Sequence, residues 1–323
     1  MLAKRRIMKI GDFEFRTPII APSFSSKGFP HANNIIKVME EHISDELLVS
    51  AYDIFYKNIN PPFDFASAII LDSGGYEASK EYELSETFER AHIPKDWLPE
   101  NYEQVVASWS ATSPTLIVSF DHPEHRLPTI DQINRAASMP LPAGPYAKAL
   151  LIKPESKGAI RVHIEKIIPH VPALTAFSVV GITEKEVGNS VHSRMLNIAR
   201  LREALDFHKL EIPIHVFGSL DTITTYLYFL SGADIFDGLT WLRYAFANGD
   251  TVYKYAPGAI NMPITTNSDI IEAGCWSHNY QYMRQMRLNM MKYLKDGSFE
   301  HFGKHHEIIK ESFLGVNAEL VGG

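Results

Sequence analysis

The sequence has little cysteine and no long hydrophobic run. Its 323 residues include one cysteine, which excludes an internal disulfide framework and any zinc site built from several cysteines. Such sparse cysteine is typical of a reducing cytoplasm, where we expect the protein to be. No apolar run approaches the ~20 residues that cross a bilayer. The basic segment Met1–Arg6 lacks a following apolar stretch, so we expect neither a membrane partner nor a signal peptide.

An excess of positive charge is also missing. The formal net charge is −7 at pH 7, which is a poor overall charge for non-specific duplex binding, because that binding depends on neutralising phosphates. A local basic patch is compatible with this balance. Hydrophobic residues make up 45% of the chain and charged residues 21%, as in a globular protein with a sizeable core.

Short apolar runs alternate with helical patterns. Eight runs are too short for buried helices and resemble buried parallel strands. They cover residues 18–21, 47–50, 68–71, 115–120, 147–152, 176–180, 213–217 and 233–236. Helical patterns include residues 33–42, 130–138, 157–168, 191–208 and 220–231. Eight such repeats predict an α/β fold, the closed (β/α)₈ TIM barrel. A doubly wound open sheet is the alternative, but no Gly-x-Gly-x-x-Gly motif follows the first strand.

We divide the chain into a barrel core and an extension. Residues 1–249 form the predicted catalytic core, and residues 77–112 are longer than one crossover helix, so they predict an insertion after the third strand. Residues 250–323 form a predicted helical subdomain packed on the barrel, with a Met-rich helix over about residues 276–294.

Three aspartates stand at the ends of predicted strands. Asp72 follows the third strand, Asp121 the fourth and Asp237 the eighth. In a barrel these strand ends lie at one face, so we expect the three carboxylates to share a pocket. Two carboxylates about 5 Å apart can divide a displacement at a sugar carbon into two steps, one as nucleophile and the other as proton donor. The alternative is that each aspartate caps the turn that follows it.

Small and flat residues accompany these acids. Gly74 and Gly75 allow a ligand close to the backbone, and the ring of Tyr76 offers a surface on which a planar base can stack. Gly181 is expected to end the sixth strand and Gly218 the seventh, where their backbone groups would form a wall around the ligand. The plainer interpretation is a half-buried core ring and two ordinary turn glycines.

The C-terminal region holds one pattern with metal-ligand spacing. Cys275 and His278 form a Cys-x-x-His segment, and His305 and His306 lie downstream. Zinc usually takes four ligands from cysteine, histidine and carboxylate groups. Cys275, His278 and His305 would supply three of them, and His306, Glu307 or water the fourth. The alternative is a small buried cysteine with histidines that bind no metal. No organic cofactor is expected.

An ordered set of segments resembles the tRNA-guanine transglycosylase family, the queuine and archaeosine tRNA-ribosyltransferases. Asp72–Tyr76 is similar to its Asp-Ser-Gly-Gly-Phe/Tyr signature, and Ile235–Arg243 to its Phe-Asp-Cys-Val-x-Pro-Thr-Arg signature. Between them, Ser119–Asp121 resembles Phe-Asp-Glu-Cys, Val180–Ile182 resembles Gly-Gly-Leu and Val216–Gly218 resembles Met-Gly-Val-Gly. The set is in family order over roughly residues 15–310 and is specific as a whole.

The resemblance implies a barrel enzyme, a pentosyltransferase that exchanges a nucleobase within a polynucleotide. Asp237 would be the nucleophile at C1′ of the target nucleoside. Asp72 would protonate the leaving guanine and deprotonate the incoming 7-deazaguanine, a free base of the preQ0 or preQ1 type. Asp121 would bind the purine edge and Tyr76 its face. The remaining implied binding residues are Ser73, Gly75, Gly181, Gly218 and Arg243.

The sequence departs from the family pattern at several elements. Pro123 replaces the cysteine after Asp121, and Lys153–Glu155 lies where the family has glutamine. The second arginine of the Thr-Arg-x-x-Arg tail is absent or displaced after Arg243, and Cys275 is the only cysteine left of the zinc motif. We expect no C-terminal RNA-binding domain.

These departures favour the DNA-modifying relatives of the family as the closer comparison. This sequence retains the segments of the chemical centre, while the elements that face tRNA in the family differ in it. A nucleic-acid partner is therefore expected, with DNA favoured and tRNA as the alternative. A non-catalytic partner subunit is a second alternative, which the two catalytic-type aspartates disfavour. Members of the family often form dimers, so a homodimer is compatible with the resemblance.

Overall fold

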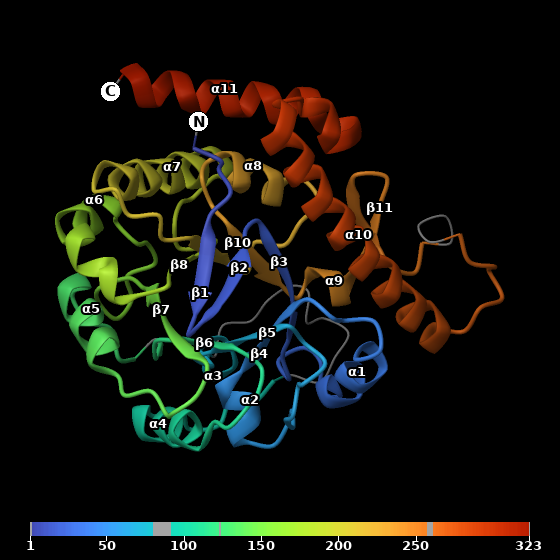
Figure 1. Ribbon diagram of the computed structural model, residues 1–323. Helices are drawn as coiled ribbons and strands as arrows, with labels where there is room; N and C mark the ends of the chain where they lie inside the picture. Colours follow the sequence, from blue (N-terminus) through green and yellow to red (C-terminus); the bar gives the residue numbers. More distant parts are fainter. Residues whose placement is uncertain (1, 80–91, 123, 257–260, 323) are drawn as a thin grey trace. The chain divides into compact units, whose positions relative to one another are not determined.

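Eight parallel strands close into a barrel in the computed structural model of the protein, which describes residues 2–79, 92–122, 124–256 and 261–322. The order around the barrel is β10-β3-β4-β5-β6-β7-β8-β9 (Figure 1). The strands are β3 (Ile19–Phe24), β4 (Glu46–Ser50), β5 (Ala68–Asp72), β6 (Thr115–Val118), β7 (Tyr146–Ile152), β8 (Val179–Thr183), β9 (Ile214–Phe217) and β10 (Ile235–Gly238). This confirms the predicted (β/α)₈ barrel.

The barrel strands form at the apolar runs because neither of their faces meets water. Every residue of β3, β4, β6, β9 and β10 is buried. A parallel strand that is covered on both faces has no reason to alternate apolar and polar residues. The register is regular along whole strands: β4 pairs with β5 from Glu46 opposite Ala68 to Ser50 opposite Asp72.

Helices connect most of the barrel strands, and further helices follow the last barrel strand, β10. They are α1 (Ala32–Met39), α2 (Ala51–Phe55), α3 (Gly75–Ala78), α4 (Pro99–Ser108), α5 (Thr129–Ser138), α6 (Ile164–Ile167), the 3-10 helix η2 (Ile168–Ala176), α7 (Val191–Phe207), α8 (Thr224–Leu230), α9 (Thr240–Arg243), α10 (Ser268–Asp296), the 3-10 helix η3 (Phe299–His305) and α11 (His306–Gly322). Two hairpins, β1 (Ile7–Ile10) with β2 (Phe13–Arg16) and β11 (Tyr244–Ala247) with β12 (Asp250–Tyr253), were not predicted.

Capping residues explain where the longest helix begins and ends. The side chain of Asn267 accepts a hydrogen bond from the backbone N–H of Ile270, 3.0 Å away, at the start of α10. At its end, Gly297 has a left-handed φ of +73° and donates its N–H to the carbonyl oxygen of Tyr293 at 2.8 Å. These are the usual start and stop signals of an α-helix.

The helix predicted over residues 157–168 is wrong in its first half. Helical structure begins only at Ile164. Gly158 has a left-handed φ of +82°, which a continuous right-handed helix does not allow. The predicted insertion over residues 77–112 contains α4, while residues 80–91 of it lie outside the described part of the chain.

The chain divides into two compact units. One holds Met1–Ile7, Arg16–Pro22 and Thr183–Gly323, and within it α11 packs on α7 and α8 (Figure 1). The other holds Met8–Phe15 and Ser23–Ile182, and within it α4 packs on α2 and α5 on β7. The predicted division after residue 249 stays a prediction. None of the described helices combines the length and the hydropathy that a membrane crossing needs.

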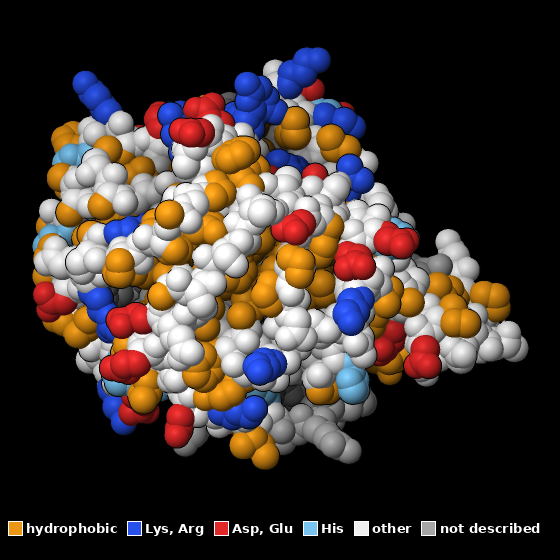
Figure 2. All heavy atoms as spheres, turned by 60° about the horizontal axis from the view of Figure 1, so that its bottom comes forward, with side chains coloured by type: hydrophobic (Ala, Val, Ile, Leu, Met, Phe, Trp, Pro, Cys, Tyr) orange, Lys and Arg blue, Asp and Glu red, His pale blue; other side chains and the backbone are white. Residues whose placement is uncertain are grey.

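The surface carries both signs of charge. Figure 2 shows one face on which acidic and basic side chains are scattered among exposed hydrophobic ones. Large hydrophobic side chains that are more than half exposed include Ile93, Ile160, Phe207, Tyr253 and Ile264.

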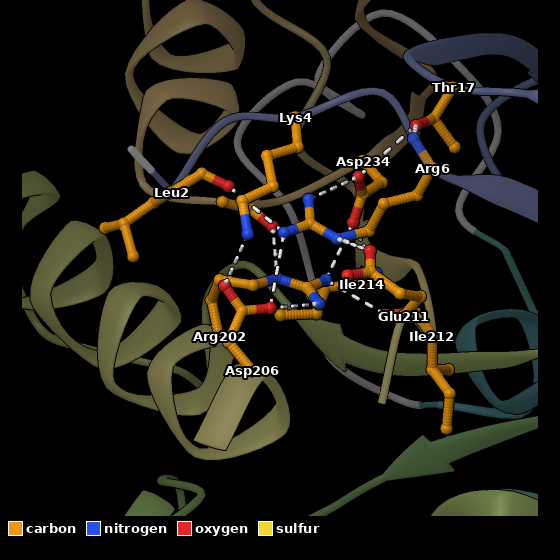
Figure 3. Close-up of polar contacts among 11 residues, drawn as sticks. Leu2, Lys4, Arg6, Thr17, Arg202, Asp206, Glu211, Ile212, Ile214 and Asp234 are labelled. Atoms are coloured by element: carbon orange, nitrogen blue, oxygen red, sulfur yellow. Dashed lines mark hydrogen bonds and ion pairs between the residues drawn. The ribbon is translucent and has the colours of Figure 1, made fainter. Parts of the chain in front are cut away.

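A network of buried charges fixes the amino-terminal end of β10. Asp234, just before the strand, accepts hydrogen bonds from Arg6 Nη1 at 3.1 Å and Arg202 Nη2 at 2.8 Å (Figure 3). Its two oxygens also accept from Thr17 Oγ1 at 3.3 Å and from the backbone N–H of Ile214 at 2.9 Å. Both arginine side chains are fully buried. The N-terminal segment is thereby tied to the barrel at the end opposite the strand-end aspartates.

Candidate functional site

The chain turns sharply after β5, where Asp72 is the last strand residue. Asp72 Oδ2 accepts a hydrogen bond from the backbone N–H of Gly74 at 3.2 Å. Gly74 has a left-handed φ of +86°, and a Cβ there would lie 2.6 Å from the Cβ of Tyr52. The turn therefore requires glycine. Asp72 caps its own turn, as the plainer interpretation expected, while it keeps its place at the strand end that the chemical interpretation needs.

The residues of this turn are closely packed, and Gly75 lies against Asp121. Ser73 is buried, and its carbonyl oxygen accepts a hydrogen bond from Trp97 Nε1 at 3.0 Å. A Cβ on Gly75 would lie 2.5 Å from Asp121 Oδ2, so only glycine allows this approach. Tyr76 is half-buried, and Lys27 Nζ lies 4.5 Å from the centre of its ring. A base that stacks on this ring would have to use its other face or displace Lys27.

Two acids are buried beside this segment. Glu77 is 2% exposed and accepts hydrogen bonds from the hydroxyl groups of Ser25 and Ser50. Burial, together with the negative charges of Asp53 and Asp72, raises the pKa of Glu77 to about 8. Burial also raises the pKa of Asp53. Glu77 therefore carries its proton at neutral pH, so this end of β5 holds less negative charge than its three acids, Asp53, Asp72 and Glu77, suggest.

Asp121 lies between two cations. Its Oδ1 is paired with Arg126 Nη1, and its Oδ2 lies 3.3 Å from Lys153 Nζ. The side chains of all three residues are about nine-tenths buried. Lys153 directly follows β7, so it comes from the strand next to the one that precedes Asp121. An acceptor and two donors are thus placed together, which suits the recognition of a polar ring edge.

A pocket of about 170 Å³ opens beside this ion pair. Phe120 and His122 line it with nearly parallel rings, their centres 6.5 Å apart. Burial and the neighbouring charge of His125 lower the pKa of His122, which favours the neutral imidazole. Arg135 also lines the pocket, with its guanidinium 5.0 Å from the centre of the Phe120 ring. Flat rings and charged donors are the combination that binds a planar polar ligand.

Asp237 lies at the carboxyl-terminal end of β10 and is 5% exposed. Its Oδ1 accepts hydrogen bonds from His215 Nε2 at 2.9 Å and from the backbone N–H of Gly218 at 3.2 Å. The strand pairing explains the contact, because His215 in β9 lies opposite Ile235 in β10.

The other predicted binding residues take different positions. Gly218 follows β9 with a left-handed φ of +73°, so it is both the expected strand-end glycine and a donor to Asp237. Gly181 does not end its strand: it pairs with Leu151, and β8 continues to Thr183. The ladder hydrogen bonds of a barrel strand tolerate an internal glycine, which the sequence pattern mistook for an end. Arg243 is half-buried at the end of α9.

The three predicted zinc ligands make separate hydrogen bonds. Cys275 is buried, which raises the pKa of its thiol to about 11, and its Sγ lies 3.5 Å from the carbonyl oxygen of Tyr244. His278 Nε2 lies 2.7 Å from the carbonyl oxygen of Phe246, and His305 Nε2 lies 2.7 Å from a carboxylate oxygen of Asp250. Within the described ranges no three metal-binding side chains form a group. As they lie here, the three side chains do not form a zinc site. Zinc binding by this protein stays a prediction.

Sequence reasoning missed five residues of these sites. Lys27, Glu77, Arg126, Lys153 and His215 are brought in by the fold. Two carried a signal. Lys153 directly follows a predicted strand, and Glu77 directly follows the aspartate turn motif.

Comparison with known protein families finds no family model that matches this chain, and comparison with curated proteins finds no match.

Proposed function

We propose that the protein is a transglycosylase that exchanges a guanine base in a polynucleotide for a free 7-deazaguanine, through a covalent glycosyl-aspartate intermediate. One observation carries the proposal: Asp72 and Asp237 end two strands of the same closed parallel barrel. In barrels of this kind the residues at the carboxyl ends of the strands build the active site. The resemblance of their flanking segments to guanine transglycosylases supplies the reaction.

The proposed reaction has two displacements at one sugar carbon. In the first, a carboxylate oxygen of Asp237 bonds to C1′, the C1′–N9 bond breaks, and guanine leaves with its electron pair after it takes a proton from Asp72. In the second, Asp72 removes the N9 proton of the incoming 7-deazaguanine, which attacks C1′ and releases the Asp237 carboxylate. Atoms and charges balance without a redox partner. The mechanism requires both carboxylates to reach the same glycosidic bond.

The surroundings of Asp237 support its role as nucleophile. His215 Nε2–H and the Gly218 N–H both donate to Oδ1 and stabilise the carboxylate anion. Its 5% exposure limits the water that would compete for the intermediate.

The surroundings of Asp121 support base recognition. Guanine and 7-deazaguanine present two N–H donor groups next to a carbonyl acceptor on one edge. The Asp121 carboxylate can accept from such donors, and Lys153 Nζ can donate to the carbonyl. Phe120 and His122 offer flat surfaces in the neighbouring pocket. A target base must leave its stack before it can reach a pocket of this kind.

We infer that the polynucleotide is DNA, because the segments of this sequence that correspond to the tRNA-facing elements of the family differ from the family pattern. An exchange assay tests both levels of the proposal. The protein is incubated with labelled guanine or preQ0 and with either duplex DNA, single-stranded DNA or tRNA. We expect label in DNA. Label in tRNA alone would overturn the choice of substrate, and label in none would overturn the enzymatic proposal and favour the non-catalytic partner subunit.

Two variants control this assay. Asp237→Asn keeps one acceptor oxygen but removes the nucleophile, so its label should fall to background. Asp12→Asn changes an exposed aspartate in the turn between β1 and β2 and should leave incorporation unchanged. Incorporation that survives in Asp237→Asn would exclude Asp237 as nucleophile.

A further inference from the structure

A histidine is buried directly behind the proposed nucleophile. His215 is 0% exposed, and its Nε2 lies 2.9 Å from Asp237 Oδ1. Its ring stacks on Phe217, with ring centres 3.7 Å apart and planes at 26°. His215 and Phe217 are two residues apart on β9, so their side chains share one face of the strand. The stack fixes the plane of the imidazole, and the strand fixes its position.

The two ring nitrogens of His215 have different surroundings. Nδ1 is buried and has no hydrogen-bond partner among the described residues. Nε2 faces a carboxylate, which only accepts hydrogen bonds. A proton on Nδ1 would therefore lack an acceptor, whereas a proton on Nε2 has one. The contacts favour the neutral tautomer with hydrogen on Nε2 and a bare lone pair on Nδ1. Asp237 is the charged group that the described contacts place against this ring.

We propose that His215 is a positioning residue for the reaction: its Nε2–H holds Oδ1 of Asp237 and thereby fixes the carboxylate as an oriented anion. The role rests on the proposed function, because it assigns His215 to the nucleophile of that reaction. Gly218 N–H donates to the same oxygen, so both contacts hold Oδ1. These contacts restrict the rotation of the carboxylate, which lowers the entropy lost when it attacks C1′.

A pair of substitutions separates positioning from packing. His215→Phe keeps a flat ring of similar size against Phe217 and removes the donor. His215→Gln loses the ring but carries an amide N–H at about the distance of Nε2. We expect His215→Phe to slow formation of the covalent intermediate on the order of 10²-fold, because a misplaced reacting group costs about that much. The KM for the free base should change little, and the acid limb of the pH–rate profile should move to higher pH.

The conservative variant provides the rescue. His215→Gln should react ~10-fold faster than His215→Phe, although glutamine packs less well than phenylalanine against Phe217. The acid limb of its pH–rate profile should move back toward that of the wild-type protein. A merely structural histidine would give the opposite order, with Phe better than Gln. Rates are expressed per folded molecule, measured by circular dichroism. A His215→Phe protein with the wild-type rate and pH profile would overturn the proposal.

A measurement on the unaltered protein keeps the inference independent of variant folding and of activity. Nitrogen-15 NMR of labelled histidine reports which ring nitrogen carries the proton. We expect His215 to show a protonated Nε2 and a bare Nδ1 across neutral pH. A proton on Nδ1 would overturn the proposal even if exchange activity is confirmed. An inactive wild-type protein with the expected tautomer would instead overturn the proposed reaction and leave the His215–Asp237 contact established.

Discussion

Two aspartates three residues apart, at opposite ends of β10, illustrate two uses of a buried carboxylate. Asp234 and Asp237 are 1% and 5% exposed. Asp234 binds two buried guanidinium groups, a hydroxyl and a backbone N–H, so both of its oxygens are held by charged partners. Asp237 accepts hydrogen bonds from an imidazole and from a backbone N–H, both on Oδ1.

The difference follows from the partners and not from burial. Full pairing with cations stabilises Asp234 and removes its reactivity, because its negative charge is compensated on both sides. The hydrogen bonds that Asp237 accepts come from an imidazole and a backbone N–H, which orient the carboxylate. The same chain segment thus supplies one residue that holds the fold together and one that we assign to chemistry. The following predictions test this contrast.

The largest expected effect is on activity at Asp237. Asp237→Asn keeps an acceptor for His215 and Gly218, so the free energy of unfolding should change by less than about 1 kcal/mol. The rate of base exchange should fall by roughly 10⁴-fold or more, because the amide is not a nucleophile. Denaturant unfolding and the exchange assay measure the two quantities on the same preparation. Loss of stability comparable to that of an Asp234 variant would break the contrast.

Asp234→Ala is expected to give the largest loss of stability. The substitution leaves Arg6 and Arg202 buried without their shared carboxylate, and such removal of one partner costs about 3–5 kcal/mol. Urea unfolding of the variant and of the wild-type protein gives the difference. Replacing Asp206, whose carboxylate is only partly buried and lies 3.5 Å from Arg6 Nη2, serves as the matched control and should cost less. Equal losses in the two variants would contradict the assignment of Asp234 as the main anchor.

A third carboxyl group, Glu77, shows what burial does without a cation. Its pKa of about 8 lies well above the ordinary value of 4.5 for a glutamate, so the folded protein binds this proton more tightly than the unfolded chain does. The stability that this proton contributes should therefore be complete below about pH 4.5 and be lost as pH rises to about 8, by roughly a few kcal/mol over that range. Glu77→Gln should remove this part of the dependence of the free energy of unfolding on pH. The free energy of unfolding of both proteins, measured from pH 5 to pH 9, tests this prediction. Parallel curves for the wild-type protein and Glu77→Gln would refute it.

The smallest expected effect is at Gly75. A Cβ in Gly75→Ala would press on Asp121, which should cost about 1–3 kcal/mol of stability and weaken binding of the free base. Calorimetric titration with a 7-deazaguanine measures the affinity. Gly315→Ala in α11 is the control, because nothing lies within 4 Å of the added atom; it should gain about 0.5–1 kcal/mol. An unchanged affinity for the base in Gly75→Ala would contradict the role of Asp121 in base recognition.

The barrel could be predicted because its strands are local features of the sequence. Each apolar run between turn residues became a strand, including Ala68–Asp72 and Ile235–Gly238. The hairpins, whose strands have exposed positions, gave no comparable signal. The end of β8 was misplaced at Gly181, because glycine favours turns but also fits inside a barrel strand.

The site was only partly predictable because its contacts join distant segments. Asp72, Asp121 and Asp237 were found because each lies at a strand end. His215 could not be found in this way, since inside the run Ile214–Phe217 a histidine looks like an ordinary core residue. Its contact with Asp237 depends on β9 pairing with β10, which only the closed barrel establishes. Lys27 and Arg126 depend on loop conformations that no local pattern encodes.

The most direct test of the central claim is to locate the covalent intermediate. The protein is mixed with a guanine-containing DNA oligonucleotide without free base, quenched, digested with protease and analysed by mass spectrometry. We predict a deoxyribosyl adduct on the peptide that contains Asp237, absent in Asp237→Asn. An adduct on another residue, or base exchange that proceeds with no adduct at any stage, would contradict the assignment of Asp237 as the nucleophile.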